Sequence, residues 1–134
     1  MKGEGWQPEI EVLEDQTSIQ KGAAFFLRAE TENGCLLGAD RAGRLGRRSE
    51  DIAEFVVSSL LEDLKTEPAT DRYLADQLIL FAALARDQTR YSIPRPTEHV
   101  ESNLWLVEII LGAKTRRKNN FLEVEGIGFH RRVS

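Results

Sequence analysis

Three polar side chains in the second half of the chain have residue types suited to nucleotide binding. Tyr73, Asp76 and Gln77 lie three and four positions apart, so on a helix they share one face near its start. On an otherwise apolar helix a carboxylate and an amide need partners, and they could hold a ribose, a base or a metal ion. The alternative, which these residues alone favour, is a capping cluster that ties the helix to a neighbouring loop.

A second candidate is His99, which follows the corner Pro94-Arg95-Pro96 and precedes Ser102, a residue type that often caps a helix. The helix dipole disfavours the charged form of a histidine at a helix N-terminus, which leaves a neutral, nucleophilic imidazole. Free N–H groups at the same end could bind a phosphate. Nucleotidyl transfer through a histidine nitrogen needs both features. The alternative, which this position alone favours, is a solvent-exposed loop histidine.

The single cysteine and the two basic segments of the chain are weaker indications of a functional site. Cys35 is the only cysteine and cannot form an internal disulfide, so we expect a small apolar strand residue rather than a catalytic thiol. One cysteine and two histidines cannot assemble a structural zinc site, and we predict no metal-ligand set. The basic segment 41–48 could cradle a phosphate backbone, but it lacks the Walker A spacing, and its composition favours the alternative of a solvated loop. The basic segment 114–118 is typical of an exposed strand edge.

The composition is that of a folded protein. The chain has 134 residues, 41% hydrophobic and 30% charged, which is enough for one compact domain or two small halves with a core. Its net charge of -4 does not indicate a general nucleic-acid binder, so any RNA contact would depend on local basic clusters or on another chain. Residues 1–4 begin no signal peptide, and the apolar run 104–111 is too short to cross a bilayer. We therefore expect a soluble, cytoplasmic protein without membrane contact.

The first half predicts three strands followed by a helix. The segments with strand patterns are residues 8–15, 23–31 and 35–38. Asn33-Gly34 predicts a type I′ hairpin turn, in which both central residues need positive φ. After a loop, Ser49 is the expected N-cap of a helix with one apolar face, and Pro68 ends it. Residues 66–69 are the expected boundary between two domains.

The second half predicts the order α-β-α-β-β. Thr70 or Asp71 would cap a helix that is apolar on every side and therefore buried. The later segments are a strand at 89–93, a helix at 103–111 and two strands at 114–118 and 121–125 joined by Asn119-Asn120. The expected class is α/β (α+β), with residues 1–66 and 70–134 each forming a β-sheet whose helices pack on one face.

Two motifs in this order have a family counterpart. The segment 71–78, with Tyr73-Leu74-Ala75-Asp76-Gln77 at its centre, is followed some twenty residues later by His99 and then Ser102-Asn103. Together they resemble the RNA 3′-terminal phosphate cyclase family, in which Tyr/His-Leu-Ala-Asp-Gln lines the ATP site and a histidine precedes a Thr-Asn pair that opens a helix. Ser102 replaces the threonine and keeps its hydroxyl. Three further segments are similar to the family: residues 5–11, 37–46 and 124–128.

The resemblance implies domains and residue roles. Residues 1–66 would be the C-terminal part of an inserted small domain, and 70–134 the last α/β repeat of the large catalytic domain. Family members are more than twice as long, so the chain would be a C-terminal portion. The expected ATP-binding residues are Tyr73, Leu74, Ala75, Asp76 and Gln77.

The resemblance also implies an ATP-dependent ligase reaction in RNA processing. His99 would take AMP from ATP, with a divalent cation such as magnesium or manganese, and an RNA 3′-phosphate end would become a 2′,3′-cyclic phosphate. The missing N-terminal portion or a second copy would complete the protein. Two alternatives are a non-catalytic cyclase-like protein of ribosome assembly, against which His99 argues, and an inactive truncated remnant.

Overall fold

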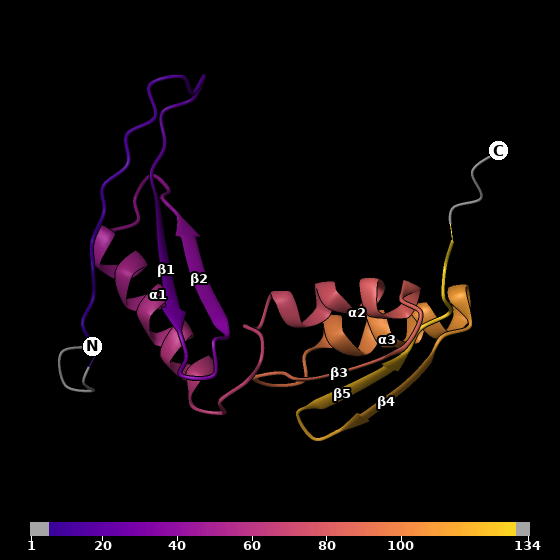
Figure 1. Cartoon of the computed structure of the whole chain (residues 1–134). Coiled ribbons are helices and arrows are strands. Elements are labelled where there is room, and N and C mark those ends of the chain that lie inside the picture. The colour runs from indigo at the N-terminus through magenta and orange to yellow at the C-terminus, as the bar shows by residue number, and fades with distance from the viewer. Residues whose placement is uncertain (1–5, 131–134) are drawn as a thin grey trace.

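The computed structural model describes residues 6–130, and Figure 1 shows that they form two lobes, each with its own sheet. The elements are β1 (Ala24–Glu30), β2 (Leu36–Ala42), α1 (Ser49–Leu64), α2 (Leu74–Leu84), β3 (Gln88–Ser92), α3 (Glu98–Leu111), β4 (Lys114–Lys118) and β5 (Phe121–Glu125). Two small sheets and three helices make an α+β fold, so the predicted class is confirmed. The start of the chain, where we expect no signal peptide, and Gly5 of the first cyclase-like segment lie outside the described residues.

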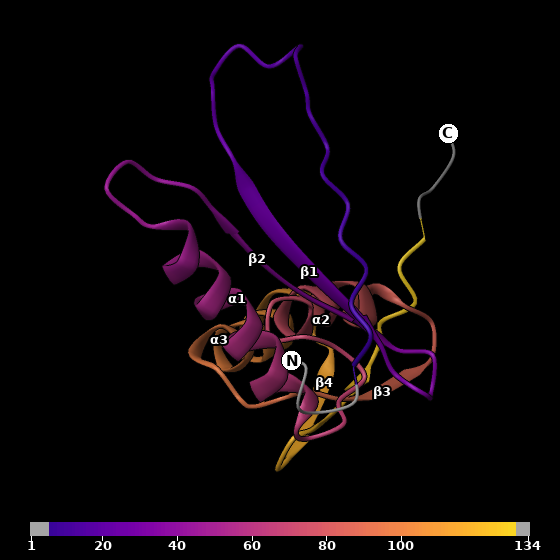
Figure 2. The ribbon, with the colours of Figure 1, turned by 90° about the vertical axis from the view of Figure 1, so that its left-hand side faces the viewer.

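In the first lobe, α1 packs on a two-stranded antiparallel sheet of β1 and β2, as Figure 2 shows. Its small core consists of Ala29, Leu37, Ala39, Ile52, Val56 and Leu60. The predicted hairpin is confirmed, but its turn is not type I′, because only Gly34 has positive φ, at 76°. The N–H of Gly34 donates to Thr31, and Thr31 in turn donates to Cys35. This three-residue loop with a left-handed glycine is a common alternative hairpin connection.

Two boundaries in this lobe differ from the prediction. The returning strand continues to Ala42, because β1 pairs with it along its whole length from Ala24. Ser49 is the first residue of α1 rather than its cap. Arg48 occupies the cap position with extended backbone and makes no side-chain capping bond, while the Ser49 hydroxyl donates to Glu50.

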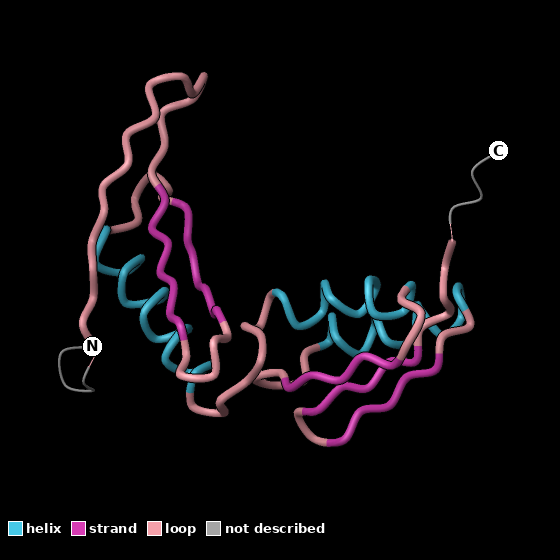
Figure 3. Tube along the Cα trace, in the orientation of Figure 1, coloured by secondary structure: helices cyan, strands magenta, loops and turns pink. Residues whose placement is uncertain are grey.

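The predicted strand at residues 8–15 is wrong. That segment has no strand pairing and runs as a loop in Figure 3. Its apolar side chains Ile10, Val12 and Leu13 are each at least 81% exposed. An alternating pattern makes a strand only where a neighbouring strand supplies backbone hydrogen bonds and a surface to cover one face. The described part of the chain supplies neither here.

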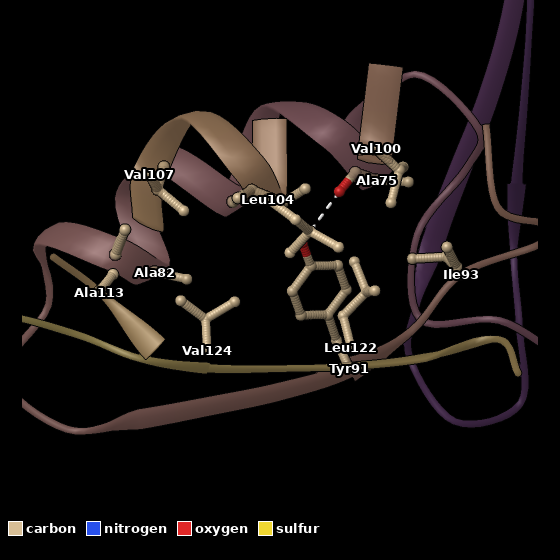
Figure 4. Packing of buried hydrophobic residues seen from close by; sticks show 12 residues of the cluster. Ala75, Ala82, Tyr91, Ile93, Val100, Leu104, Val107, Ala113, Leu122 and Val124 are labelled. Atoms are coloured by element: carbon tan, nitrogen blue, oxygen red, sulfur yellow. Dashed lines mark hydrogen bonds between the residues drawn. The ribbon is translucent and has the colours of Figure 1, made fainter. Parts of the chain in front are cut away.

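In the second lobe, the antiparallel sheet has the order β3-β5-β4, and α2 and α3 cover one of its faces. The predicted β4–β5 hairpin is confirmed, with Asn119 in the left-handed region at φ 54°. Side chains from both helices and from β3 and β5 meet in the core shown in Figure 4, together with Ala113 just before β4. Within it the Tyr91 hydroxyl donates to the Ala75 carbonyl at 2.9 Å, which satisfies a polar group that would be costly to bury alone.

The expectation that the first helix of this lobe is buried on every side is wrong. Leu80 is 50% and Phe81 68% exposed, and the neighbouring α3 exposes Ile109 and Ile110 to a similar extent. The two helices form a single layer, and none of the described elements covers the face of that layer opposite the sheet (Figure 1). None of the described helices is long and apolar enough to cross a membrane.

Side-chain bonds hold the linker between the lobes. Asp71, one of the two expected caps, accepts from the N–H groups of Tyr73 and Leu74 at 3.0 and 2.8 Å. Its other oxygen accepts from Gly38 of the first lobe at 3.1 Å. The neighbouring Arg72 reaches Asp63 at the end of α1. The start of α2 is therefore tied to both strand and helix of the first lobe.

Because of Tyr91, we expect the stability of the fold to fall as pH rises in the alkaline range. Burial, and secondarily the charge of Asp76, raise the pKa of Tyr91 from 10.0 to about 12. The folded state thus holds this proton more tightly than the unfolded state. The contribution of Tyr91 to the free energy of unfolding is therefore complete below about pH 10 and is lost as pH rises through 12. We expect Tm to fall over this interval, and to fall less in Tyr91→Phe. Tyrosinate absorbance should show a step near pH 12 that this variant lacks, and absence of that step from the wild type would contradict the prediction.

Candidate functional site

The structure brings His99 and the Tyr73-Asp76-Gln77 cluster to one open cavity of about 280 Å³, together with Arg72 and Thr97. The cavity lies where α2 and α3 both begin, at the end of the second lobe nearest the linker (Figure 1). All six lining residues carry polar groups. A cavity with one imidazole, one carboxylate, one amide, one guanidinium and two hydroxyls can hydrogen-bond a polar ligand from several directions.

His99 is the second residue of α3 and is exposed to solvent. Its predicted place at a helix N-terminus is confirmed, but Ser102 lies inside the helix and is not the cap. Thr97 has the extended backbone of a cap residue, with φ −120° and ψ 163°, and its hydroxyl accepts from Val100 N–H at 3.2 Å. The buried Val100 side chain anchors the first turn, which carries His99, to the core.

The N-terminal end of α3 offers two backbone donors. Val100 N–H is taken by the Thr97 hydroxyl and Glu101 N–H by the Thr97 carbonyl. In the described part of the chain the N–H groups of Glu98 and His99 have no acceptor. These unpaired groups, at the positive end of the helix dipole, are suited to a phosphate oxygen.

Asp76 is half-buried in the first turn of α2. Its backbone carbonyl accepts from the Asn103 side chain of α3 at 3.2 Å, which joins the starts of the two helices. Among the described residues no donor bonds to its carboxylate, so both carboxylate oxygens are available to a ligand. The same carboxylate is close enough to Tyr91 to contribute to the raised pKa of that hydroxyl.

Two of the expected ATP-binding residues do not line the cavity. Leu74 is 37% exposed at the first position of α2, and Ala75 is buried in the core, where its carbonyl accepts from Tyr91. Tyr73 and Gln77 are exposed at the cavity wall. The role of all five residues in binding ATP stays a prediction.

Arg72 and Thr97 are cavity residues that sequence reasoning did not single out. Thr97 had a signal, since it follows a proline and precedes Glu98 and Glu101, acidic residues typical of a first helical turn. Arg72 belongs to the family-like segment 71–78, but nothing indicated its pairing with Asp63, which is nine residues away on another helix. The Arg72 guanidinium bonds both Asp63 oxygens, at 2.9 and 3.1 Å from Nε. These bonds raise the pKa of Arg72 further above its usual range, so it stays charged at the cavity wall.

A larger, mainly apolar groove of about 490 Å³ continues from this cavity between α2 and α3. Asp76 and Gln77 lie at its polar end, shared with the first cavity, and the remaining lining side chains are Leu80, Phe81, Asn103, Leu106, Val107, Ile110 and Leu111. The polar cavity is the better candidate for chemistry, since the groove lacks any titratable group besides Asp76.

Comparison with known proteins points to one family. Residues 2–65 match the model of the RNA 3′-terminal phosphate cyclase (RTC) insert domain. The RNA 3′-terminal phosphate cyclase of Korarchaeum cryptofilum is 34% identical over 134 aligned residues, which cover 96% of this chain and 38% of the relative. The comparisons support the cyclase family. The matched insert-domain segment ends at Lys65, immediately after α1, and the second lobe is matched by the cyclase relatives.

Other relatives agree in name and in extent. The RNA 3′-terminal phosphate cyclase of Pyrobaculum neutrophilum is 30% identical over 129 residues, which cover 93% of this chain and 37% of that relative. A probable RNA 3′-terminal phosphate cyclase of Dictyostelium discoideum is 29% identical over 133 residues, which cover 90% of this chain and 31% of that relative. The chain thus spans about a third of the length of these cyclase relatives.

Proposed function

We propose that this chain is the C-terminal portion of an RNA 3′-terminal phosphate cyclase and carries its histidine nucleophile. The observation that supports this most is the shared cavity of His99, Tyr73, Asp76 and Gln77, in a chain whose relatives are named as that enzyme. On this proposal residues 1–66 are the C-terminal part of the inserted small domain and 70–134 the last repeat of the large domain. The reaction would take place in the cytoplasm.

In the proposed reaction, Tyr73, Asp76 and Gln77 hold ATP so that the His99 imidazole faces the α-phosphorus. A ring nitrogen attacks that phosphorus, the bond to pyrophosphate breaks, and AMP stays on the ring. The Glu98 and His99 N–H groups at the start of α3 are placed to neutralise charge on phosphate oxygens. AMP then passes to the RNA 3′-phosphate, and the neighbouring 2′-hydroxyl displaces it, closing the 2′,3′-cyclic phosphate.

A divalent cation fits this site only as a companion of the triphosphate. No group of three potential ligands gathers anywhere among residues 6–130, and Asp76 is the one carboxylate at the cavity. Magnesium commonly binds one or two carboxylates together with substrate phosphates. Asp76 would therefore supply a single ligand, and the ion, when bound, would offset charge on the phosphates.

The uncovered face of α2 and α3 supports a need for more protein than this chain. Leu80, Phe81 and Ile110 are each at least 50% exposed there, and contiguous apolar patches of this kind mark interaction surfaces. The two-stranded sheet of the first lobe also has both edges open, and such edges pair readily. Either the remaining cyclase portion or a second copy would cover these surfaces.

The chain alone is therefore expected to self-associate. Light scattering over a range of protein concentrations should give an average mass that rises above that of the monomer, because exposed apolar side chains gain free energy on burial. Phe81→Glu combined with Ile110→Glu should reduce the association, whereas Glu98→Gln, on the polar start of α3, should not. A constant monomer mass at every concentration would count against the prediction.

The proposal is tested by covalent labelling. The chain is incubated with α-labelled ATP and magnesium or manganese, alone and after fusion to the N-terminal portion of a cyclase relative. We expect an AMP adduct with the completed protein and little or none with the chain alone, since further phosphate contacts would come from the added part. A completed protein that binds ATP without ever carrying AMP would favour the non-catalytic alternative.

A further inference from the structure

The sheet of the second lobe has an uncovered outer face with a distinct composition. Leu122, Val124 and Tyr91 point inward and are buried against the helices. Because side chains alternate along a strand, their neighbours on β3 and β5 point outward, and the register of the sheet aligns them with outward residues of β4. The outward side chains are Gln88, Arg90, Ser92, Lys114, Arg116, Lys118, Phe121, Glu123 and Glu125.

Most charges on this face are already paired. Glu123 contacts Arg90 at 3.3 Å and Glu125 contacts Lys114 at 3.6 Å. Arg117 lies on the opposite side of β4, where it bonds Glu101 of α3 at 2.6 Å. Within residues 6–130 this leaves Arg116 and Lys118 as outward cations without a carboxylate partner. The face therefore carries local positive charge although the chain as a whole is acidic.

Phe121 lies beside these two cations. It is 65% exposed, and its register partner on β4 is Lys118, one outward position from Arg116. An exposed aromatic ring next to unpaired cations on an open sheet can stack a base and neutralise the adjoining phosphates. A protein partner fits less well, since it would bury two cations that form no ion pair among residues 6–130, where Glu123 and Glu125 are paired with Arg90 and Lys114.

The position of Phe121 relates this face to the cavity. Phe121 begins β5 opposite Ser92, the last residue of β3, and the chain passes from Ser92 through the proline corner directly to Thr97 and His99. In Figure 1 this end of the sheet, where β3 ends and β5 begins, lies at the end of the lobe where α2 and α3 begin. A strand of RNA whose 3′ end entered the cavity could continue over this end of the sheet and along its outer face.

We propose that the outer face of the β3-β5-β4 sheet, centred on Phe121, Arg116 and Lys118, binds single-stranded RNA upstream of the reacting 3′ end. The assignment of the ligand as RNA with its 3′ end at His99 rests on the proposed function. Base stacking on Phe121 and phosphate contacts from the two cations supply the binding, without selection for base sequence.

The test is fluorescence anisotropy with the full 134-residue chain and a labelled short oligouridylate, prepared with a 3′-phosphate or a 3′-hydroxyl. Phe121→Ala should weaken binding about tenfold or more, in line with the loss of one base–aromatic stack. Arg116→Ala with Lys118→Ala should lower the slope of log affinity against log salt by about 1.4, as expected for two single-strand phosphate contacts.

Matched variants in the first lobe serve as controls. Phe26 is similarly exposed, at 61%, on a strand of the other sheet, and Arg44 and Arg47 form an equally cationic loop pair. Phe26→Ala and Arg44→Ala with Arg47→Ala should leave affinity and salt slope unchanged. Circular dichroism should show that all variants stay folded, since none of the replaced side chains belongs to either core.

Two results would overturn the proposal: no binding to the oligouridylate at low salt, or affinity that depends on Arg44 and Arg47 but not on Phe121. Its failure is distinguishable from failure of the cyclase assignment. Binding that needs Phe121 for both 3′ ends, without AMP labelling of a completed protein, supports the surface and refutes the chemistry. AMP labelling with RNA binding insensitive to Phe121→Ala supports the chemistry and refutes the surface.

Discussion

Replacement of His99 by alanine in a completed cyclase is expected to reduce covalent AMP labelling to background. A methyl group has no lone pair to attack the α-phosphorus, whereas the remaining cavity residues would still bind the nucleotide. The adduct of the parent protein should be labile in acid and stable in alkali, as a phosphoramidate is. Gel analysis after incubation with α-labelled ATP measures both properties.

His130→Ala is the matched control, because the chain has only two histidines. His130 lies next to Arg86 at the far end of α2, with 3.3 Å between Nδ1 and the guanidinium, and outside the cavity. Its replacement should leave labelling intact. Asp76→Ala should slow labelling by roughly a hundredfold without abolishing it, since positioning and nucleophile are separable contributions. Labelling that persists in His99→Ala would refute the assigned nucleophile.

Where sequence reasoning succeeded, local rules and tertiary packing agreed. The hairpin of β4 and β5 follows from two short strand patterns around Asn119, a residue type that tolerates the left-handed region it adopts. The gathering of Tyr73, Asp76 and Gln77 with His99 also follows from order alone. α2 starts at the linker, and β3 runs back to the same end of the lobe before α3 starts, so the first turns of the two helices lie together.

Where it failed, the outcome depended on partners far away in the sequence or outside the described chain. The strand pattern of 8–15 had no neighbouring strand, so alternation alone was insufficient. Leu80 and Phe81 have the composition of a buried face, but the described residues provide only one layer to bury it. Thr97 and Ser102 are equally good cap residues by type. The extended backbone after Pro96 decides for Thr97, which moves His99 into the helix.

Arg72→Leu is expected to cause the largest loss of stability among single side-chain changes at the site. Asp63 is 2% exposed, and its carboxylate takes three bonds from Arg72, two from Nε and one from the backbone N–H. With leucine only the backbone bond would remain. Removing one partner of a buried ion pair leaves an uncompensated charge and typically costs about 3–5 kcal/mol. Urea denaturation followed by circular dichroism would measure the change.

Arg95→Leu provides a matched control, because Arg95 is half-exposed and its one ion pair within residues 6–130 is with the exposed Glu62, at 3.4 Å. Exposed ion pairs of this kind contribute little to stability. The midpoint of urea denaturation of Arg95→Leu should therefore stay close to that of the parent protein. Replacing Asp63 and Arg72 together with leucine should cost less than the sum of the single changes, since neither charge is then stranded. Equal losses of stability in Arg72→Leu and Arg95→Leu would contradict the expected contribution of the Arg72–Asp63 ion pair. Because Arg72 precedes Tyr73 and lines the cavity, its loss should also weaken nucleotide binding in conditions where the protein remains folded.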